Sequence, residues 1–179
     1  MYQEFDLVFT AGKGLLSRAI RWATTDPGEE KSLTNHVGII SKGGDVKEAK
    51  IIEALWHVEN HSLYGQYHNN GTVAVFRPLN LTEEQKEIIR AYLLKHVGNK
   101  YGWWKLGFHA AARFTRWKWI RNLSFLDSRP ICSYLVARAF EEAGLSFGME
   151  ADGADPDEMM DFCLEHDDKY QIIHLMKRI

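Results

Sequence analysis

Short apolar runs of strand character recur along the chain, and segments rich in glycine, aspartate and other turn-forming residues separate them. Five such runs predict strands, at residues 5–10, 36–41, 51–55, 72–77 and 170–176. The turn KGGD follows the second run, so the second and third strands are expected to form an antiparallel hairpin. Together with strand 72–77 they predict a small antiparallel meander.

Other segments carry the spacing of amphipathic helices. The helical pattern covers residues 15–23, 82–96 and 132–143. Thr82 and Gln85 have the spacing of a capping box at the start of the second segment. Asp155 followed by Pro156 predicts the start of a further helix. The segment HVENHSLYGQYHNNG, residues 57–71, is interpreted as an irregular loop.

These elements predict an α+β fold in which a small antiparallel sheet packs against helices. The chain has 179 residues, of which 45% are hydrophobic and 26% are charged. This length and composition are typical of one soluble globular domain, here residues 1–179. Two cysteines do not make a disulfide framework, and they suit a reducing compartment.

The net charge and the N-terminal sequence indicate which partners and which cellular location to expect. The formal net charge of −2 gives no reason to expect a nucleic-acid partner. Six basic residues lie within 101–130 and eleven acidic ones within 141–168, and these segments either face each other or are solvated surface. The N-terminus lacks a signal-peptide pattern, and no stretch approaches the ~20 apolar residues of a membrane span. A cytoplasmic protein is expected.

Cys132 lies on the apolar stripe of helix 132–143 and also at its N-terminal end. An inward cysteine usually serves as a small hydrophobic residue of the core. At a helix N-terminus, however, the unpaired N–H groups and the helix dipole favour the thiolate. The helix pattern alone leaves both interpretations open, and a nucleophilic thiol would also need a base.

His36 is the histidine best placed to act as that base, because it stands at the entry to an apolar strand. In the predicted hairpin Glu53 lies near Gly38 and close to His36, where its carboxylate could orient the imidazole. Two other interpretations stay open. His36 could be a structural histidine at a strand end, and Glu53 could pair with Arg77 or a lysine instead.

A second group of histidines, His57, His61 and His68, is a candidate zinc site. Because these residues fall in the segment interpreted as an irregular loop, no metal and no other cofactor are expected. Cys163 is far along the chain from His36 and is interpreted as a core residue.

The order of these motifs resembles the permuted papain-like amidases and peptidases of the NlpC superfamily, whose relatives include lecithin:retinol acyltransferase-like enzymes. The resemblance covers about residues 5–176. It rests on the HVGI strand, the acid in the following strand and the CS-x-LV helix start, in the order FDLVFT, AIRWATT, NHVGII, IIEAL, VAVFRP, HVGNKYG, ICSYLVARAFEEAGL and DPDEM.

This resemblance implies a single permuted papain-like cysteine hydrolase domain with a circularly permuted, NlpC-type fold. It implies Cys132 as nucleophile, His36 as general base and acid, and Glu53 as the orienting residue. The backbone N–H of Cys132 would hold the oxyanion. Tyr101 matches a tyrosine that these families often place before the cysteine segment, where it would line the pocket or aid the oxyanion.

The aromatic and basic segment 102–127 is longer than the resemblance leads us to expect. Trp103 and Trp104 are candidate substrate-binding residues, in a lid that holds an acyl or aromatic group. Contact with a membrane surface is a second interpretation, and simple core packing is a third.

The sequence leaves three functions open. The first is a cysteine hydrolase that cleaves an amide, peptide or ester bond in a small peptide or acylated substrate through an acyl-enzyme. The second is an acyltransferase in which a lipid or amine acceptor replaces water. The third is a catalytically silent binding module of the same fold.

Overall fold

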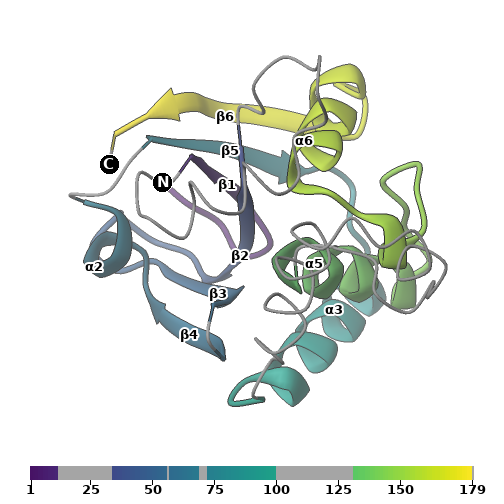
Figure 1. Cartoon of the computed structure of the whole chain (residues 1–179), viewed down its shortest axis with the longest axis horizontal. Helices are drawn as coiled ribbons and strands as arrows, with labels where there is room; N and C mark the ends of the chain where they lie inside the picture. The colour runs from purple at the N-terminus through teal and green to yellow at the C-terminus, as the bar shows by residue number, and fades with distance from the viewer. Residues whose placement is uncertain (12–33, 56, 69–71, 100–130, 179) are drawn as a thin grey trace, which may run out of the picture.

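The computed structural model describes residues 1–11, 34–55, 57–68, 72–99 and 131–178. Within them, six strands form one antiparallel sheet in the order β4-β3-β2-β1-β5-β6 (Figure 1). The strands are β1 (Leu7–Ala11), β2 (His36–Lys42), β3 (Lys50–Ala54), β4 (Val58–Ser62), β5 (Thr72–Pro78) and β6 (Tyr170–Lys177). The expected α+β class and the packing of an antiparallel sheet against helices are therefore confirmed.

All five predicted strands are present, with two differences. The first strand begins at Leu7 rather than Phe5, because Phe5 has a φ of 73° and so leaves the extended conformation. The predicted meander of strands 36–41, 51–55 and 72–77 is wrong in its third member. Strand β5 pairs with β1 and β6, and the neighbour of β3 is β4.

The prediction of an irregular loop at residues 57–71 is also wrong for its described part. That stretch forms edge strand β4 and the short helix α2 (Leu63–Tyr67). Strand β4 alternates poorly because most of its side chains are exposed, which is the pattern of a strand with a neighbour on one side only. Ser62 caps α2 by accepting a hydrogen bond from the N–H of Gly65.

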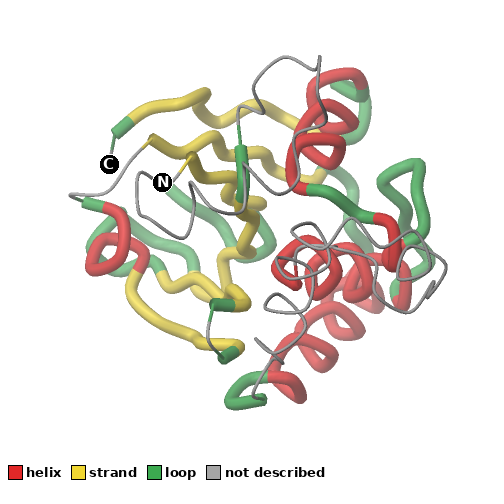
Figure 2. Tube along the Cα trace, in the orientation of Figure 1, coloured by secondary structure: helices red, strands yellow, loops and turns green. Residues whose placement is uncertain are grey.

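The remaining described helices agree with the sequence. They are α3 (Glu83–His96), α5 (Ile131–Glu142) and α6 (Pro156–Glu165), with a short 3₁₀ helix, η2 (Ala151–Gly153), before α6. Thr82 and Gln85 form the expected capping box, and Asp155 caps α6. Helices α3 and α5 lie beside each other (Figure 2). The predicted helix at 15–23 falls outside the described residues.

The sheet is covered on both faces, by two separate apolar clusters. The larger cluster lies between the sheet and helices α3, α5 and α6, and includes Phe9, Phe76 and Phe140. The smaller one lies under α2 and includes Ile51 and Leu63. None of the helices in the described part of the chain is long and apolar enough to cross a membrane.

Candidate active site

Cys132 lies in the first turn of α5, and only 5% of its surface is exposed. The neighbouring Ser133 is fully buried, and its hydroxyl donates a hydrogen bond of 2.6 Å to the carbonyl of Ala154. This bond fixes the first turn of α5 against the segment that leads into α6. The thiol is thus held on a rigid helix end, where the backbone N–H groups point out of the helix.

His36 and Glu53 come from the paired strands β2 and β3. Ile39 pairs with Ile52, and this register brings Gly38 beside Glu53 as the hairpin predicts. A Cβ atom on Gly38 would lie 3.1 Å from the Cβ of Glu53, so glycine leaves space for the carboxylate side chain. The Nε2–H of His36 donates a hydrogen bond to Glu53 Oε2.

The Glu53 carboxylate is buried with no exposed side-chain surface, yet it is the charged form that the site stabilises. Burial raises the pKa of Glu53. The charge of His36, the hydrogen bonds from His36 and Tyr67 and the close contact with His61 together outweigh burial and lower that pKa to about 2. Glu53 is therefore an anion throughout the physiological pH range.

The same interactions act on His36 in the opposite direction. Burial lowers the pKa of His36, but the charges of Cys132 and Glu53 and the hydrogen bonds from His36 to both residues raise it well above its ordinary value. Because Nε2 is bound to Glu53, Nδ1 is the ring nitrogen left to share a proton with the thiol.

Two further side chains reach Glu53 and were not singled out from the sequence for this role. The hydroxyl of Tyr67, from α2, donates a hydrogen bond to Oε2. His61 Nε2, from β4, lies 2.7 Å from Oε1. Thr10, which pairs with His36 across β1 and β2, hydrogen-bonds Tyr67. No local sequence signal predicts these contacts, because they depend on the pairing of β4 and the placement of α2.

The three histidines of the candidate zinc site contact different partners. His61 contacts Glu53, His57 lies 4.0 Å from Glu59, and the ring of His68 hydrogen-bonds the carbonyl of Tyr64. In the part of the chain that the structure describes, no group of three or more histidine, cysteine or acidic residues is arranged to hold a metal ion.

Several other predictions for single residues have clear outcomes. Cys163 is fully buried in the main core as expected, and burial raises the pKa of its thiol. The alternative pairing of Glu53 with Arg77 is wrong, because Arg77 forms a bidentate salt bridge with buried Asp6. The candidate substrate-binding residues Tyr101, Trp103 and Trp104 fall outside the described residues.

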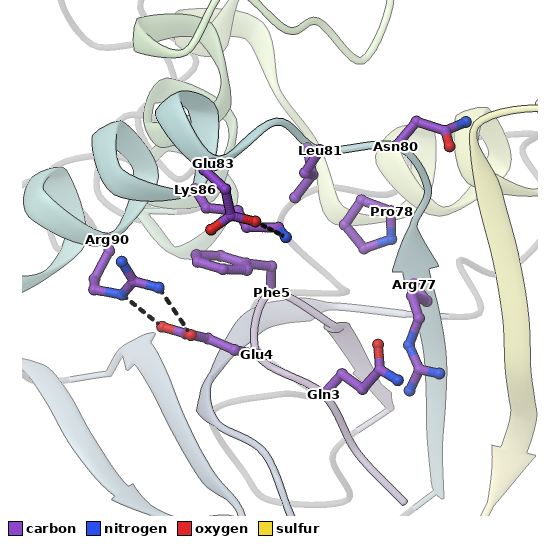
Figure 3. A pocket seen from close by; sticks show the side chains of 10 residues that line it. All are labelled: Gln3, Glu4, Phe5, Arg77, Pro78, Asn80, Leu81, Glu83, Lys86 and Arg90. Carbon is purple, nitrogen blue, oxygen red and sulfur yellow. Dashed lines mark hydrogen bonds and ion pairs between the residues drawn. The ribbon is translucent and has the colours of Figure 1, made fainter.

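A surface pocket of about 390 Å³ lies between the start of β1, the end of β5 and the start of α3 (Figure 3). It is at the opposite end of β1 from the residue that pairs with His36. Its cations are already matched by acids, since Arg90 binds Glu4, Lys86 binds Glu83 and Arg77 binds Asp6. The pocket is therefore separate from the Cys132 cluster and has no unmatched charge to attract an ion.

Comparison with protein-family models found no match, and comparison with curated proteins found none either. Among solved structures, the chain is similar to a crystal structure described as the metalloprotein YiiX from Escherichia coli O157:H7, DUF1105. The TM-score is 0.53 at 21% sequence identity, over 82% of this chain and 69% of that one. At this level of identity the similarity concerns the fold alone.

Proposed function

We propose that this protein is a cysteine hydrolase with a permuted papain-like fold, which cleaves an amide, peptide or ester bond. The observation that carries the proposal is the cluster of Cys132, His36 and Glu53. A thiol at a helix N-terminus interacts with an imidazole, whose other nitrogen is bound to a buried carboxylate. This is the nucleophile, base and orienting group of covalent catalysis.

In the proposed reaction the thiolate of Cys132 attacks the carbonyl carbon of the substrate and forms a tetrahedral oxyanion. The imidazolium of His36 gives its proton to the leaving amine or alcohol as the scissile bond breaks, which leaves a thioester on Cys132. His36 then takes a proton from water, whose oxygen attacks the thioester. The carboxylic acid product leaves, and the thiolate and imidazolium are restored.

Glu53 performs no proton transfer in this scheme. Its low pKa keeps it charged, so it stabilises the imidazolium and holds the ring with Nδ1 toward the thiol. The backbone N–H of Cys132, at the first turn of α5, is the proposed oxyanion donor. The helix dipole favours negative charge at the same place.

The order of elements supports the permuted form of the fold. The strand of His36 and the strand of Glu53 both precede the helix of Cys132 in the chain. Transfer of the acyl group to a lipid or amine would use the same thioester, and product analysis with and without an acceptor would separate the two reactions.

Alkylation of Cys132 by iodoacetamide tests the proposal without a known substrate. Mass mapping of the two cysteine peptides reads Cys132 and Cys163 in the same sample, so buried Cys163 is the internal control. We expect Cys132 to react rapidly at about pH 6, where an ordinary thiol is almost fully protonated. His36→Ala should abolish this reactivity. Slow reaction of Cys132 in both proteins would refute the proposal.

A further inference from the structure

Three polar side chains contact the Glu53 carboxylate, two at one oxygen and one at the other. Oε2 accepts from His36 and from Tyr67. Among the described residues, the polar group that faces Oε1 is the ring of His61, with Nε2 at 2.7 Å. We propose that His61 is a positioning residue of the reaction, which holds Oε1 in place so that Oε2 stays aligned on His36. This inference rests on the proposed function.

The contact between His61 and Glu53 fixes which nitrogen of His61 carries a hydrogen. Glu53 is an anion and can only accept, so a neutral or charged imidazole at 2.7 Å must present N–H rather than a lone pair. The angles do not meet those of a hydrogen bond, but within the described residues neither Oε1 nor Nε2 has another hydrogen-bond partner. Nε2 of His61 is therefore the donor nearest to Oε1, and Oε1 is the acceptor nearest to Nε2.

Removing His61 would leave one oxygen of a buried carboxylate without a donor, which is costly. The carboxylate can rotate about its last bond, and it would then draw the hydroxyl of Tyr67 or the ring of His36 toward the empty oxygen. Either change weakens the bond that orients His36. The proposed ion pair of His36 and Cys132 depends on that bond. The effect of His61 on the nucleophile is therefore indirect and acts through Glu53 and then His36.

Other ionisable groups lie on the same side of the sheet as His61 and have to be considered. Glu59 of β4 lies there, since it pairs with Glu53 across the strands, and His57, just before β4, lies 4.0 Å from Glu59. Both are more than two-fifths exposed, so water screens their charges. From β2 there is His36, with Cys132 beyond it, and from α2 there are two tyrosines, Tyr64 and Tyr67.

The test compares His61→Leu with His61→Gln, using the rate of Cys132 alkylation between about pH 5 and pH 9. Glutamine keeps an N–H donor near the position of Nε2 but cannot titrate, whereas leucine has no donor. We expect alkylation at about pH 6 to slow about tenfold in His61→Leu, the order of effect of removing one polar group from a buried charge. His61→Gln should restore most of the rate.

His57→Leu is the matched control, because it removes an exposed imidazole just before β4 that lies beside Glu59 rather than Glu53. It should leave the pH profile unchanged. Thermal unfolding of every variant separates a loss of fold from a loss of alignment, and a purely structural His61 would lower the melting temperature without moving the profile.

The outcomes distinguish the two proposals. A parent protein without rapid alkylation at about pH 6 would refute the proposed function itself. A parent with rapid alkylation and a His61→Leu variant with the same profile would overturn only the role of His61. An equal loss of reactivity in His61→Gln and His61→Leu would also overturn it, because the donor would then not be what matters.

Discussion

Replacing Glu53 by glutamine removes the buried charge while keeping nearly the same shape. The pKa of Glu53 is lowered from 4.5 to about 2 in the folded protein. A difference of about 2.5 pKa units corresponds to about 3 kcal/mol of folding free energy near pH 7, at 1.36 kcal/mol per unit. We therefore expect Glu53→Gln to lower the free energy of unfolding by about 3 kcal/mol.

The pH dependence gives a sharper test than the size of the effect. Because the folded pKa of Glu53 is depressed, its contribution is fully present above pH 4.5 and is lost as the pH falls toward about 2. Urea unfolding of the parent and of Glu53→Gln, followed by circular dichroism, should show a gap near pH 7 that narrows progressively between about pH 5 and pH 2. The other acids are the same in both proteins, so their titration cancels.

Two results would refute this reasoning. One is a Glu53→Gln variant as stable as the parent near pH 7, which would mean that His36, His61 and Tyr67 are satisfied without the charge. The other is a stability gap that does not change with pH, which would show that the loss comes from packing rather than from the carboxylate. Glu59→Gln, on the same face but half-exposed, is the control and should change stability little.

Three other substitutions test how the fold supports the site. Ser133→Ala leaves the buried carbonyl of Ala154 without its donor and should lower the free energy of unfolding by about 1–3 kcal/mol in urea titrations; an unchanged value would contradict the anchoring of α5. Thr82→Ala removes the cap of α3 and should lower the free energy of unfolding by about 1 kcal/mol. Thr82→Ser keeps the capping hydroxyl and should leave that free energy nearly unchanged in the same urea titrations. Gly38→Val adds a Cβ only 2.7 Å from Cδ1 of Ile51 and should destabilise by about 1–3 kcal/mol, with slower alkylation of Cys132; parent-like stability would show that the hairpin has room to spare.

The local elements of this fold were largely predictable because their signals are local. The apolar runs of β2, β3 and β6 and the capping box of α3 each lie within one segment, and the structure has them where the sequence places them. The neighbour of β5 was not predictable in the same way. Pairing of β5 with β1 joins segments far apart in the chain, and no periodic pattern records it.

Strand β4 was missed for a physical reason that applies to edge strands in general. Residues Glu59 and Asn60 are exposed, and only Val58 is buried, so the segment has neither a clear alternation nor a run of β-branched residues. Its backbone hydrogen bonds to β3 hold it in place, and these do not depend on the side chains.

In the candidate site, too, some residues were predictable from local sequence signals and others were not. Local patterns in the sequence predict the positions of three of its residues. Cys132 lies at a helix start, His36 at the start of a strand and Glu53 inside an apolar strand. The hairpin register then predicts that His36 and Glu53 meet, and they do. His61 and Tyr67 carry no such mark, since they reach Glu53 only through the unpredicted β4 and α2.

The interior position of β1 in the sheet has a consequence for how the chain acquires its structure during synthesis. Strand β2 is the next strand after β1 and can pair with it early. The other edge of β1 stays unpaired until β5 has been synthesised, and the outer edge of β5 stays unpaired until β6 has been synthesised. A growing chain that has not yet reached Tyr170 leaves β5 with an unpaired edge of buried-type residues, which invites association with other chains. Such long-range pairing is also intrinsically slow. We therefore expect nascent or truncated forms of this protein to depend on chaperones far more than the finished chain does.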